Sequence, residues 1–556
     1  MMRYVRNALA FARVPIFALI CTGCPSDPKP SAVGSCVDCH SPSPEMAIED
    51  AHPAYSLTCV SCHGGDNSKS NKAEAHIAPP PNELLTADGE PWQNSAESAG
   101  LQLKRLATDK LDALLAEGYK DYIQFINPGD FRVLDRTCAT CHPKHAETVP
   151  KSVMSTFTGH YNVPRFLAGL QTREAAYGVQ ALQVSYDETD LPEGVVSEIT
   201  VLRPPESHGE TPTMETLMDH YLAQRCPTCH AASFGENNAA GAYRSSGCTS
   251  CHMVYHDDGL SRSADPTISK TTKPHPARHV LTTAIPTEQC AHCHFQGARI
   301  GLFYRGFRED VGFVESTLDQ DKAEWFERYQ RRVVVKEDKN SDIDTTPPDL
   351  HYEAGMDCID CHVGQDVHGN GYMYSSSKFQ VGIRCEDCHG TIDASIREGP
   401  EGGFITRAGD TLSRLKRVGD KIMLEVRASG ALLEVAQVTQ AIEHNSLAKQ
   451  AMGRDEGGFS HTDSIECHTC HTAWRQSCFG CHIEINAKFD VSIPSHQTGE
   501  PGPRGLVRGQ RDTFSLEHIF LGTNNRGKIS TVCPSEQLTM TYTNEAGEKV
   551  IDHEVR

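Results

Sequence analysis

Twenty of the 23 cysteines in this chain of 556 residues belong to ten copies of one pentapeptide, Cys-x-x-Cys-His. The paired cysteines are Cys36, Cys39, Cys59, Cys62, Cys138, Cys141, Cys226, Cys229, Cys248, Cys251, Cys290, Cys293, Cys358, Cys361, Cys385, Cys388, Cys467, Cys470, Cys478 and Cys481. The closing histidines are His40, His63, His142, His230, His252, His294, His362, His389, His471 and His482. Two thiols at this spacing can each bond a vinyl group of one porphyrin, and the next histidine then lies beneath the ring as an axial ligand to iron. The repeat therefore predicts ten covalently attached c-type haems.

Two other uses of paired cysteines compete with haem attachment. Structural zinc sites need four ligands from two pairs, and they give no reason for a histidine directly after every second cysteine. A disulfide framework is typical of small secreted domains, and a redox dithiol occurs once or twice in a fold, not ten times with histidine. Haem attachment explains all three fixed residues of the motif, whereas these alternatives explain the cysteines alone.

Each iron also needs a second axial ligand, or it keeps an open face, and this choice separates an electron carrier from an enzyme. The 28 histidines of the chain are sufficient for histidine on both faces of ten irons. The distal candidates lie a few residues from a motif or on a short helix expected to face one: His52, His76, His145, His160, His220, His256, His279, His351, His368, His444 and His461. Because there are eleven names for ten places, at least one is not a ligand. For each of them the alternative is a solvated or hydrogen-bonded histidine.

The composition predicts how the chain is arranged around the haems. Ten porphyrins leave few residues per cofactor, and the chain is only 38% hydrophobic with 44 glycines and 31 prolines. We therefore expect a mostly irregular fold in which short α-helices wrap around a multihaem core. Apolar periodicity predicts helices over 96–117 and 322–332, whereas 42–58 and 64–93 have the composition of loops. Alternating apolar runs with glycine turns predict small β-units near residues 400–440 and 515–550.

The spacing of the motifs divides the chain into five segments. Residues 1–24 have the features of an export signal, and residues 25–390 form a multihaem region with eight haem sites. A small β-rich insertion over 391–445 separates this region from a two-haem segment over 446–490. The strand-like tail over 491–556 either pairs with the earlier β-unit or belongs to a longer parent protein that has been cut.

The first 24 residues also bear on location. Arg3, Arg6 and Arg13 precede a short apolar run, and the following Thr-Gly-Cys24 resembles the cleavage site of bacterial lipoproteins, which would make Cys24 the lipidated first residue. No other stretch reaches the eighteen or more apolar residues that a spanning helix needs. We expect an exported protein, either periplasmic or held at the outer membrane or cell surface as a lipoprotein, with membrane contact only through the anchor at Cys24.

The formal net charge of −21 excludes one class of partner and favours another. Such an acidic particle does not bind nucleic acid or an anionic lipid surface by bulk charge. It is suited to basic or metal-bearing partners, although acidity that merely maintains solubility is an equal alternative.

Several phrases around the motifs resemble those of large multihaem, including decahaem, cytochromes from metal-reducing and related deltaproteobacteria. The phrases are Phe125-Ile-Asn-Pro-Gly-Asp, Thr158-Gly-His-Tyr, Gln296-Gly-Ala-Arg-Ile-Gly-Leu, Gly355-Met-Asp-Cys-Ile-Asp-Cys-His and the run from Cys467 to His482. This resemblance implies a periplasmic or outer-surface carrier tied to extracellular electron transfer. The expected partners are other cytochromes or redox proteins, metal oxides or soluble metal acceptors, and no substrate is named.

Two functions follow from the coordination of the irons. If all irons hold two histidines, the protein is an electron conduit with low potentials and no catalytic residue. If one iron keeps an open face, the protein is a multihaem reductase or oxidase for a small nitrogen or sulfur oxyanion. All ten motifs end in histidine and none in lysine, which weakens one class of such enzymes. We expect the conduit.

Overall fold

The structure is a computed structural model that describes part of the chain. The described residues are 35–40, 51–53, 55–80, 118–202, 213–224, 226–232, 245–254, 280–291, 293–294, 304, 348–400, 402–471, 477–488, 504–515, 521–524, 526–531 and 538–555. The expected export signal and the helices expected over 96–117 and 322–332 lie outside these ranges.

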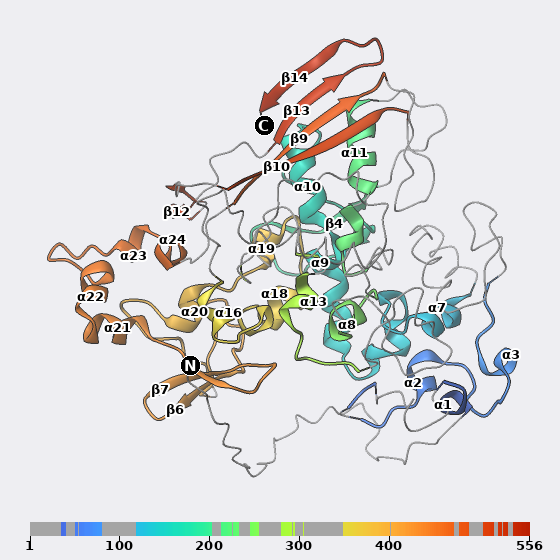
Figure 1. Cartoon of the computed structure of the whole chain (residues 1–556), viewed down its shortest axis with the longest axis horizontal. Coiled ribbons are helices and arrows are strands. Elements are labelled where there is room, and N and C mark those ends of the chain that lie inside the picture. The colour runs from blue at the N-terminus through green and yellow to red at the C-terminus, as the bar shows by residue number, and fades with distance from the viewer. Residues whose placement is uncertain are drawn as a thin grey trace, which may run out of the picture.

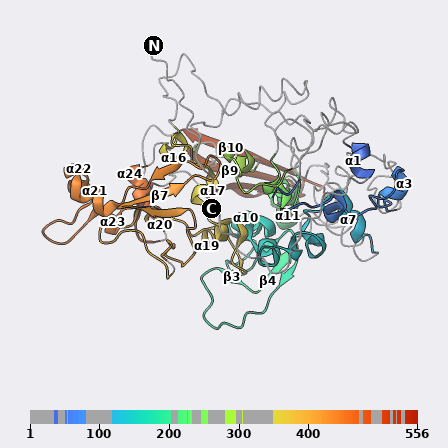
Figure 2. The same ribbon diagram turned by 90° about the horizontal axis from the view of Figure 1, so that it is seen from below.

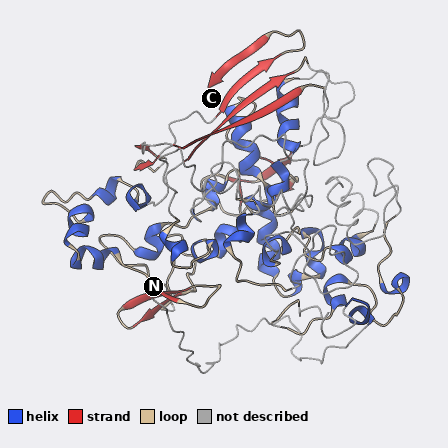
Figure 3. Cartoon of the chain, viewed as in Figure 1, coloured by secondary structure: helices blue, strands red, loops and turns tan. Residues whose placement is uncertain are grey.

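Short helices dominate the described residues (Figure 3). The α-helices are α1 (Ser35–His40), α2 (Cys59–His63), α3 (Lys72–Ala75), α7 (Lys120–Ile126), α8 (Pro143–Thr148), α9 (Val153–Thr156), α10 (Thr158–Leu167), α11 (Met214–Gln224), α12 (Thr249–His252), α13 (Thr287–Ala291), α16 (Leu350–Glu353), α17 (Cys358–Cys361), α18 (Gly364–His368), α19 (Ser377–Gln380), α20 (Cys385–His389), α21 (Val438–His444), α22 (Ser446–Met452), α23 (His461–Ser464) and α24 (Cys467–His471). The 3₁₀ helices are η2 (Phe131–Arg136), η3 (Cys138–Thr140), η4 (Val149–Lys151) and η5 (Cys226–Cys229). Helix α3 lies within 64–93, where the composition predicted loop.

The strands form small sheets, of which the C-terminal one is the most extended. The strands are β1 (Tyr177–Gly178), β2 (Leu182–Gln183), β3 (Val195–Val196), β4 (Glu198–Val201), β5 (Met373–Tyr374), β6 (Leu415–Val418), β7 (Lys421–Glu425), β8 (Leu432–Glu434), β9 (Ser477–Asn486), β10 (Leu506–Ser515), β11 (Leu521–Thr523), β12 (Ile529–Thr531), β13 (Leu538–Thr543) and β14 (Lys549–Val555). In Figure 1 the helices spread along the long axis, from α1, α3 and α7 at one end to α20–α24 at the other, and Figure 2 shows the same order.

The C-terminal sheet has the strand order β10-β9-β13-β14 and packs against helices α10 and α11. Strand β9 pairs antiparallel with β10 and parallel with β13. Ile483 and Ile485 alternate along β9 and are buried with Leu217 and Met218 of α11, as the two-residue period of a strand requires. The tail therefore pairs with β9 and not with the β-unit near 400–440, among the described strands.

The second sheet is the antiparallel unit β6-β7-β8, in the region where alternation predicted a β-unit. Its core contains Phe404, Ile422, Leu424 and Val426, each no more than 5% exposed. Cys361 and Cys388, from two different motifs, pack against this core. The unit thus braces the motif helices α17 and α20.

None of the described helices is both long enough and apolar enough to cross a membrane.

Candidate metal centres

Nine of the ten motifs lie on a helical turn, and this explains their local chemistry. Residues three apart on a helix are neighbours on one face, so a single turn presents both thiols of Cys-x-x-Cys on one side, with the histidine directly following. The motif that begins at Cys478 is different, because it lies in strand β9.

The second variable residue of the motif caps the turn in three cases. In α17 the Asp360 carboxylate accepts a hydrogen bond from the Asp357 backbone at 2.9 Å, and in α20 Asp387 accepts one from the Arg384 backbone at 2.9 Å. Ser61 accepts one from Thr58 in the same way in α2. These bonds satisfy backbone donors that a helix start leaves free.

The two buried aspartates also hold the β6-β7-β8 unit. Asp360 accepts a bond from the Arg427 backbone at 2.9 Å, and Asp387 accepts bonds from the Arg407 backbone and side chain at 2.8 and 3.0 Å. No role was predicted for the variable positions of the motif. The acidic residue directly before the second cysteine, in Cys-Ile-Asp-Cys and Cys-Glu-Asp-Cys, was the signal that could have identified them.

Several motif histidines have a fixed proton position. The Nδ1 atom lies 2.6 Å from the Phe125 carbonyl in His63, 2.8 Å from the Thr282 carbonyl in His252 and 2.8 Å from the Ala436 carbonyl in His389. A carbonyl oxygen only accepts, so Nδ1 donates and the neutral ring keeps the lone pair of Nε2 for a metal. Metal-binding histidines in proteins show the same partnership through their second nitrogen.

Burial keeps these imidazoles neutral. It lowers the pKa of His63, of His252 and of His389, in each case as the largest effect. Burial, with the neighbouring His145 and His252, lowers the pKa of His368 to about 4. The pKa of His362 is instead raised, because its ring bonds the Asp366 carboxylate at 3.2 Å.

Three motif histidines face a distal candidate across a matching gap. The ring centres are 6.1 Å apart in His40–His76, 6.0 Å in His252–His368 and 6.1 Å in His389–His351. Imidazole nitrogen binds a first-row metal at about 2 Å and the ring centre lies roughly 1 Å beyond, so two imidazoles on opposite faces of one iron have centres about 6 Å apart. Each of these three pairs would therefore suit an iron held between its two imidazoles, where it would supply one-electron exchange.

His145 does not form such a pair with its own motif. Its ring centre lies 6.2 Å from that of His142, but the two residues are three apart at the start of α8. A three-residue span of at most about 11 Å is too short to pass around a porphyrin from one face to the other. His145 instead lies 4.6 Å from the His368 ring, beside the His252–His368 pair.

The other distal candidates have varied surroundings. His160 and the motif histidine His230 both contact the Phe157 ring, at 4.6 and 5.8 Å between centres. His220 is 3% exposed on α11, whereas the side chain of His444 is 75% exposed at the end of α21. The remaining described candidates contact other groups: the His52 ring lies 5.7 Å from that of Tyr55, and His461 bonds the Ala451 carbonyl at 2.8 Å. His256 and His279 lie outside the described residues.

Among the motif cysteines whose side chains are described, Cys141 is disulfide-bonded and the others form no disulfide. Thiols of different motifs influence one another in three pairs: Cys138 and Cys248, Cys290 and Cys358, and Cys385 and Cys467. The neighbouring Cys248 lowers the pKa of the Cys138 thiol to about 7, and Cys290 lowers the pKa of the Cys358 thiol to about 7. Among the described residues, the structure contains no cluster of three or more histidine, cysteine or acidic side chains that could hold a metal ion by themselves.

Comparison with known proteins finds a family model and curated relatives that match part of the chain. Residues 318–390, which include the motifs at Cys358 and Cys385, match the family model of cytochrome c554 and c-prime. Over 230 residues the chain is 21% identical to cytochrome c-552 of Haemophilus ducreyi, which covers 38% of this chain and 44% of that relative. The chain thus spans less than half the length of this curated relative, and no solved structure matches it.

Proposed function

We propose that this multihaem c-type cytochrome holds ten haems, mostly between two histidines, and acts as an exported electron conduit in the periplasm or at the outer surface. The family match and the relative support the coarser statement: a c-type cytochrome with haem c and a role in electron transfer or redox chemistry. The count of ten rests on the ten pentapeptides.

The observation that carries the proposal is the set of three facing imidazole pairs, His40–His76, His252–His368 and His389–His351. An iron held on both faces has no site for a substrate, and such haems supply reversible one-electron exchange. Hydrogen bonds at Nδ1 would orient His252, His389 and His351 as ligands, and such bonds tune the potential of the metal that a histidine holds. The proposal also includes an electron donor, an electron acceptor and a lipid anchor at Cys24.

The mass of the mature protein tests the number of haems. We expect an added mass of ten haems on the processed chain. A mass short of ten haems, with one disulfide remaining, would contradict the count and assign the bond at Cys141 to the mature protein.

Electron paramagnetic resonance of the oxidised protein tests the coordination. The conduit predicts low-spin ferric irons throughout and a reduced spectrum that carbon monoxide does not change. A stoichiometric high-spin signal, together with a response to carbon monoxide, would contradict the conduit and support the reductase or oxidase with one open iron.

A matched pair of variants tests the assignment of distal ligands. His368→Met should raise the potential of one haem, because a methionine ligand favours the reduced iron. His444→Met, at an exposed position, should leave every potential unchanged. Spectroelectrochemical titration measures both, and an unchanged titration curve in His368→Met would remove that histidine from the ligand set.

A further inference from the structure

Two histidines of the proposed ligand set bond carboxylates. The Nδ1 atom of His362 lies 3.2 Å from the Asp366 carboxylate, and that of His351 lies 2.8 Å from the Asp349 carboxylate. A carboxylate only accepts, so each ring donates its Nδ1 proton and keeps the lone pair of Nε2 for iron. His252 bonds a neutral backbone carbonyl instead. The sites therefore differ in the charge of the group that faces Nδ1.

Asp366 is placed so that its charge acts on His362. It is 4% exposed, and its other carboxylate oxygen accepts a bond from the Gly382 backbone at 2.8 Å. Two other buried aspartates of this region, Asp360 and Asp387, each pair with an arginine, at 3.5 and 3.0 Å. In the part of the chain that the structure describes, Asp366 pairs with no lysine or arginine. The imidazole of His362 is therefore the group that receives its charge.

A carboxylate at Nδ1 changes the electronic properties of an imidazole ligand. It draws the proton away from the ring, so the ring becomes more basic and donates more electron density to iron. The ferric state gains more than the ferrous state from this donation and from a nearby negative charge, which lowers the potential. A neutral carbonyl acts in the same direction but less, because hydrogen bonds with a charged partner are stronger. A haem held by a carboxylate-bonded histidine should thus have a lower potential than one held by a carbonyl-bonded histidine.

Helix α18 brings the two kinds of site together, and it lies near the middle of the long axis in Figure 1. The ring centre of its last residue, His368, is 6.0 Å from that of His252, and Asp366 lies two positions earlier. Residues two apart on a helix do not face each other. Asp366 thus contacts the histidine of the motif before α18, whereas His368 contacts the motif that begins at Cys248. Among the described residues, neither His252 nor His368 bonds a carboxylate.

We propose that Asp366 sets a step in potential across α18. Asp366 lowers the potential of the haem at Cys358 below that of the haem held by His252, so electrons pass spontaneously from the first to the second. One electron leaves the ferrous iron beside His362, which is oxidised, and reduces the ferric iron beside His252, and no bond forms or breaks. The inference rests on the proposed function, since it requires both haems, and it gives the conduit a direction at this place.

Asp366→Asn in the haem-loaded protein tests the step. The amide oxygen can still accept a bond from Nδ1, but the negative charge is removed. At a fixed electrode potential the ferric-to-ferrous ratio of one haem should fall by about tenfold, the size expected for the loss of a charged hydrogen bond. Spectroelectrochemical titration measures this shift. Electron paramagnetic resonance should also show a wider spread of g values for one low-spin haem, because its imidazole has lost anionic character.

Asp357→Asn is the matched control. Asp357 directly precedes Cys358, and its carboxylate accepts bonds from the backbone and the hydroxyl of Thr287, both at 2.8 Å, and not from a histidine. The variant thus removes the same charge beside the same motif and should change the ratio by less than about twofold. No shift in Asp366→Asn, or an equal shift in both variants, overturns the proposal.

A second site decides the question if Asp366→Asn fails to fold. Asp349 acts on His351 as Asp366 acts on His362, so Asp349→Asn should raise the potential of a different haem by a similar amount. Glu353→Gln is its control, since Glu353 is an exposed residue of α16, the helix that Asp349 caps, and it should leave the titration curve unchanged. An unchanged curve in Asp349→Asn would overturn the proposal, because a carboxylate at Nδ1 would then have no effect on potential.

The titration of the parent protein gives the sign of the step. The parent potential that is lost in His368→Met belongs to the haem at Cys248. The parent potential that moves in Asp366→Asn belongs to the haem at Cys358. The first should be the higher of the two, and the reverse order overturns the step. If His368→Met changes no potential, the proposed ligation itself fails, whereas a change in His368→Met without one in Asp366→Asn refutes the step alone.

Discussion

The β6-β7-β8 unit and the helices that carry the motifs acquire their order in different ways. Phe404 and Val426 in the unit are 1% and 0% exposed, and the strands bury a contiguous apolar cluster. Helix α2, by contrast, has five residues and none of them is buried, and the same is true of α24. Isolated helices of this length are unstable in water. The β-unit is therefore stabilised by its own apolar core, whereas the motif helices depend on what their cysteines and histidines bind.

Removal of all haems should give the largest difference between the motif helices and the β-unit, because only the helices should unfold. In a chain produced without haem attachment, the motif helices lose their covalent and axial anchors, so far-UV circular dichroism should show loss of most helical signal. Limited proteolysis followed by mass spectrometry should find cleavage in 118–152 and 348–390 before cleavage in 402–437. Native-like helical content in the haem-free chain would contradict the contrast.

Phe404→Ala should have the next largest effect, confined to the β-unit. Truncation of a buried phenylalanine costs about 3–5 kcal/mol, because it leaves a cavity in the core. Leu432→Ala, at a residue 53% exposed on β8, is the control and should change stability by less than about 0.5 kcal/mol. Chemical denaturation followed by circular dichroism measures both, and equal destabilisation by the two variants would argue against the core described above.

Gly247→Ala should have an intermediate effect at the junction of the motifs at Cys138 and Cys248. The backbone of Gly247 has φ +70°, and an added Cβ would collide with the Gly129 carbonyl. Gly430→Ala is a matched control, since Gly430 has φ +68° and open space around it. The collision should make Gly247→Ala about 1–3 kcal/mol more destabilising than the control in denaturant titrations. Equal destabilisation by the two variants would mean that the backbone near Gly129 moves to accommodate the added Cβ without strain.

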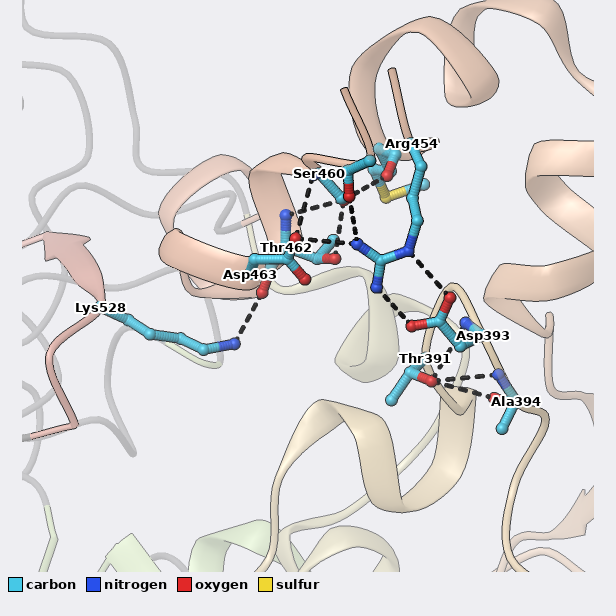
Figure 4. A network of polar contacts seen from close by, with 10 residues as sticks. Thr391, Asp393, Ala394, Arg454, Ser460, Thr462, Asp463 and Lys528 are labelled. Carbon is cyan, nitrogen blue, oxygen red and sulfur yellow. Dashed lines mark hydrogen bonds and ion pairs between the residues drawn. The ribbon is translucent and has the colours of Figure 1, made fainter. Parts of the chain in front are cut away.

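Arg454→Gln should have the smallest effect. Figure 4 shows Arg454 between Asp393, which follows α20, and Asp463 of α23, with bonds of 3.0 and 2.9 Å. The guanidinium lowers the pKa of Asp393, and the Ser460 backbone together with Arg454 lowers the pKa of Asp463. A lowered carboxylate pKa gives stability that is present at neutral pH and is lost as the pH falls through the folded-state pKa. The difference in melting temperature between Arg454→Gln and the parent should therefore be small at pH 7, shrink in high salt and disappear below about pH 3. A difference in melting temperature that persists in acid would mean that Arg454 stabilises the fold through packing and not through its ion pairs.

The sequence predicted the chemistry of the motifs better than their arrangement. The pentapeptide states which residues can attach a porphyrin, because thiol spacing and the adjoining imidazole are local properties. The partner of each imidazole is not local: His252 faces His368, more than one hundred residues away, and His389 faces His351, which precedes it. Position near a motif or on a short helix placed His145 and His444 among the ligand candidates. The three-residue span from His142 already excludes His145 from the far face of its own motif, whereas only the structure shows that His444 is exposed.

The prediction of elements followed the same division. Alternation in 403–440 predicted a β-unit, and three antiparallel strands lie there. The tail pairs with β9, a strand that contains a motif, and nothing in the motif itself indicates strand. The short helix α3 was missed because its order depends on the Asn71 cap, which accepts a bond from Glu74 at 3.0 Å, and on neighbours far along the chain.

The contact of Cys361 and Cys388 with the core around Phe404 has a consequence for biogenesis. Once the β-unit has docked, through Asp360 and Asp387, both cysteines are partly buried against its apolar core, which restricts the approach of a maturation enzyme. Thioether formation at these two positions is therefore expected before docking, and the chain presents them first, since the β-unit follows them in sequence. The position of the β-unit in the sequence thus favours one order of assembly, in which haem attachment at these two motifs comes before the β-unit docks.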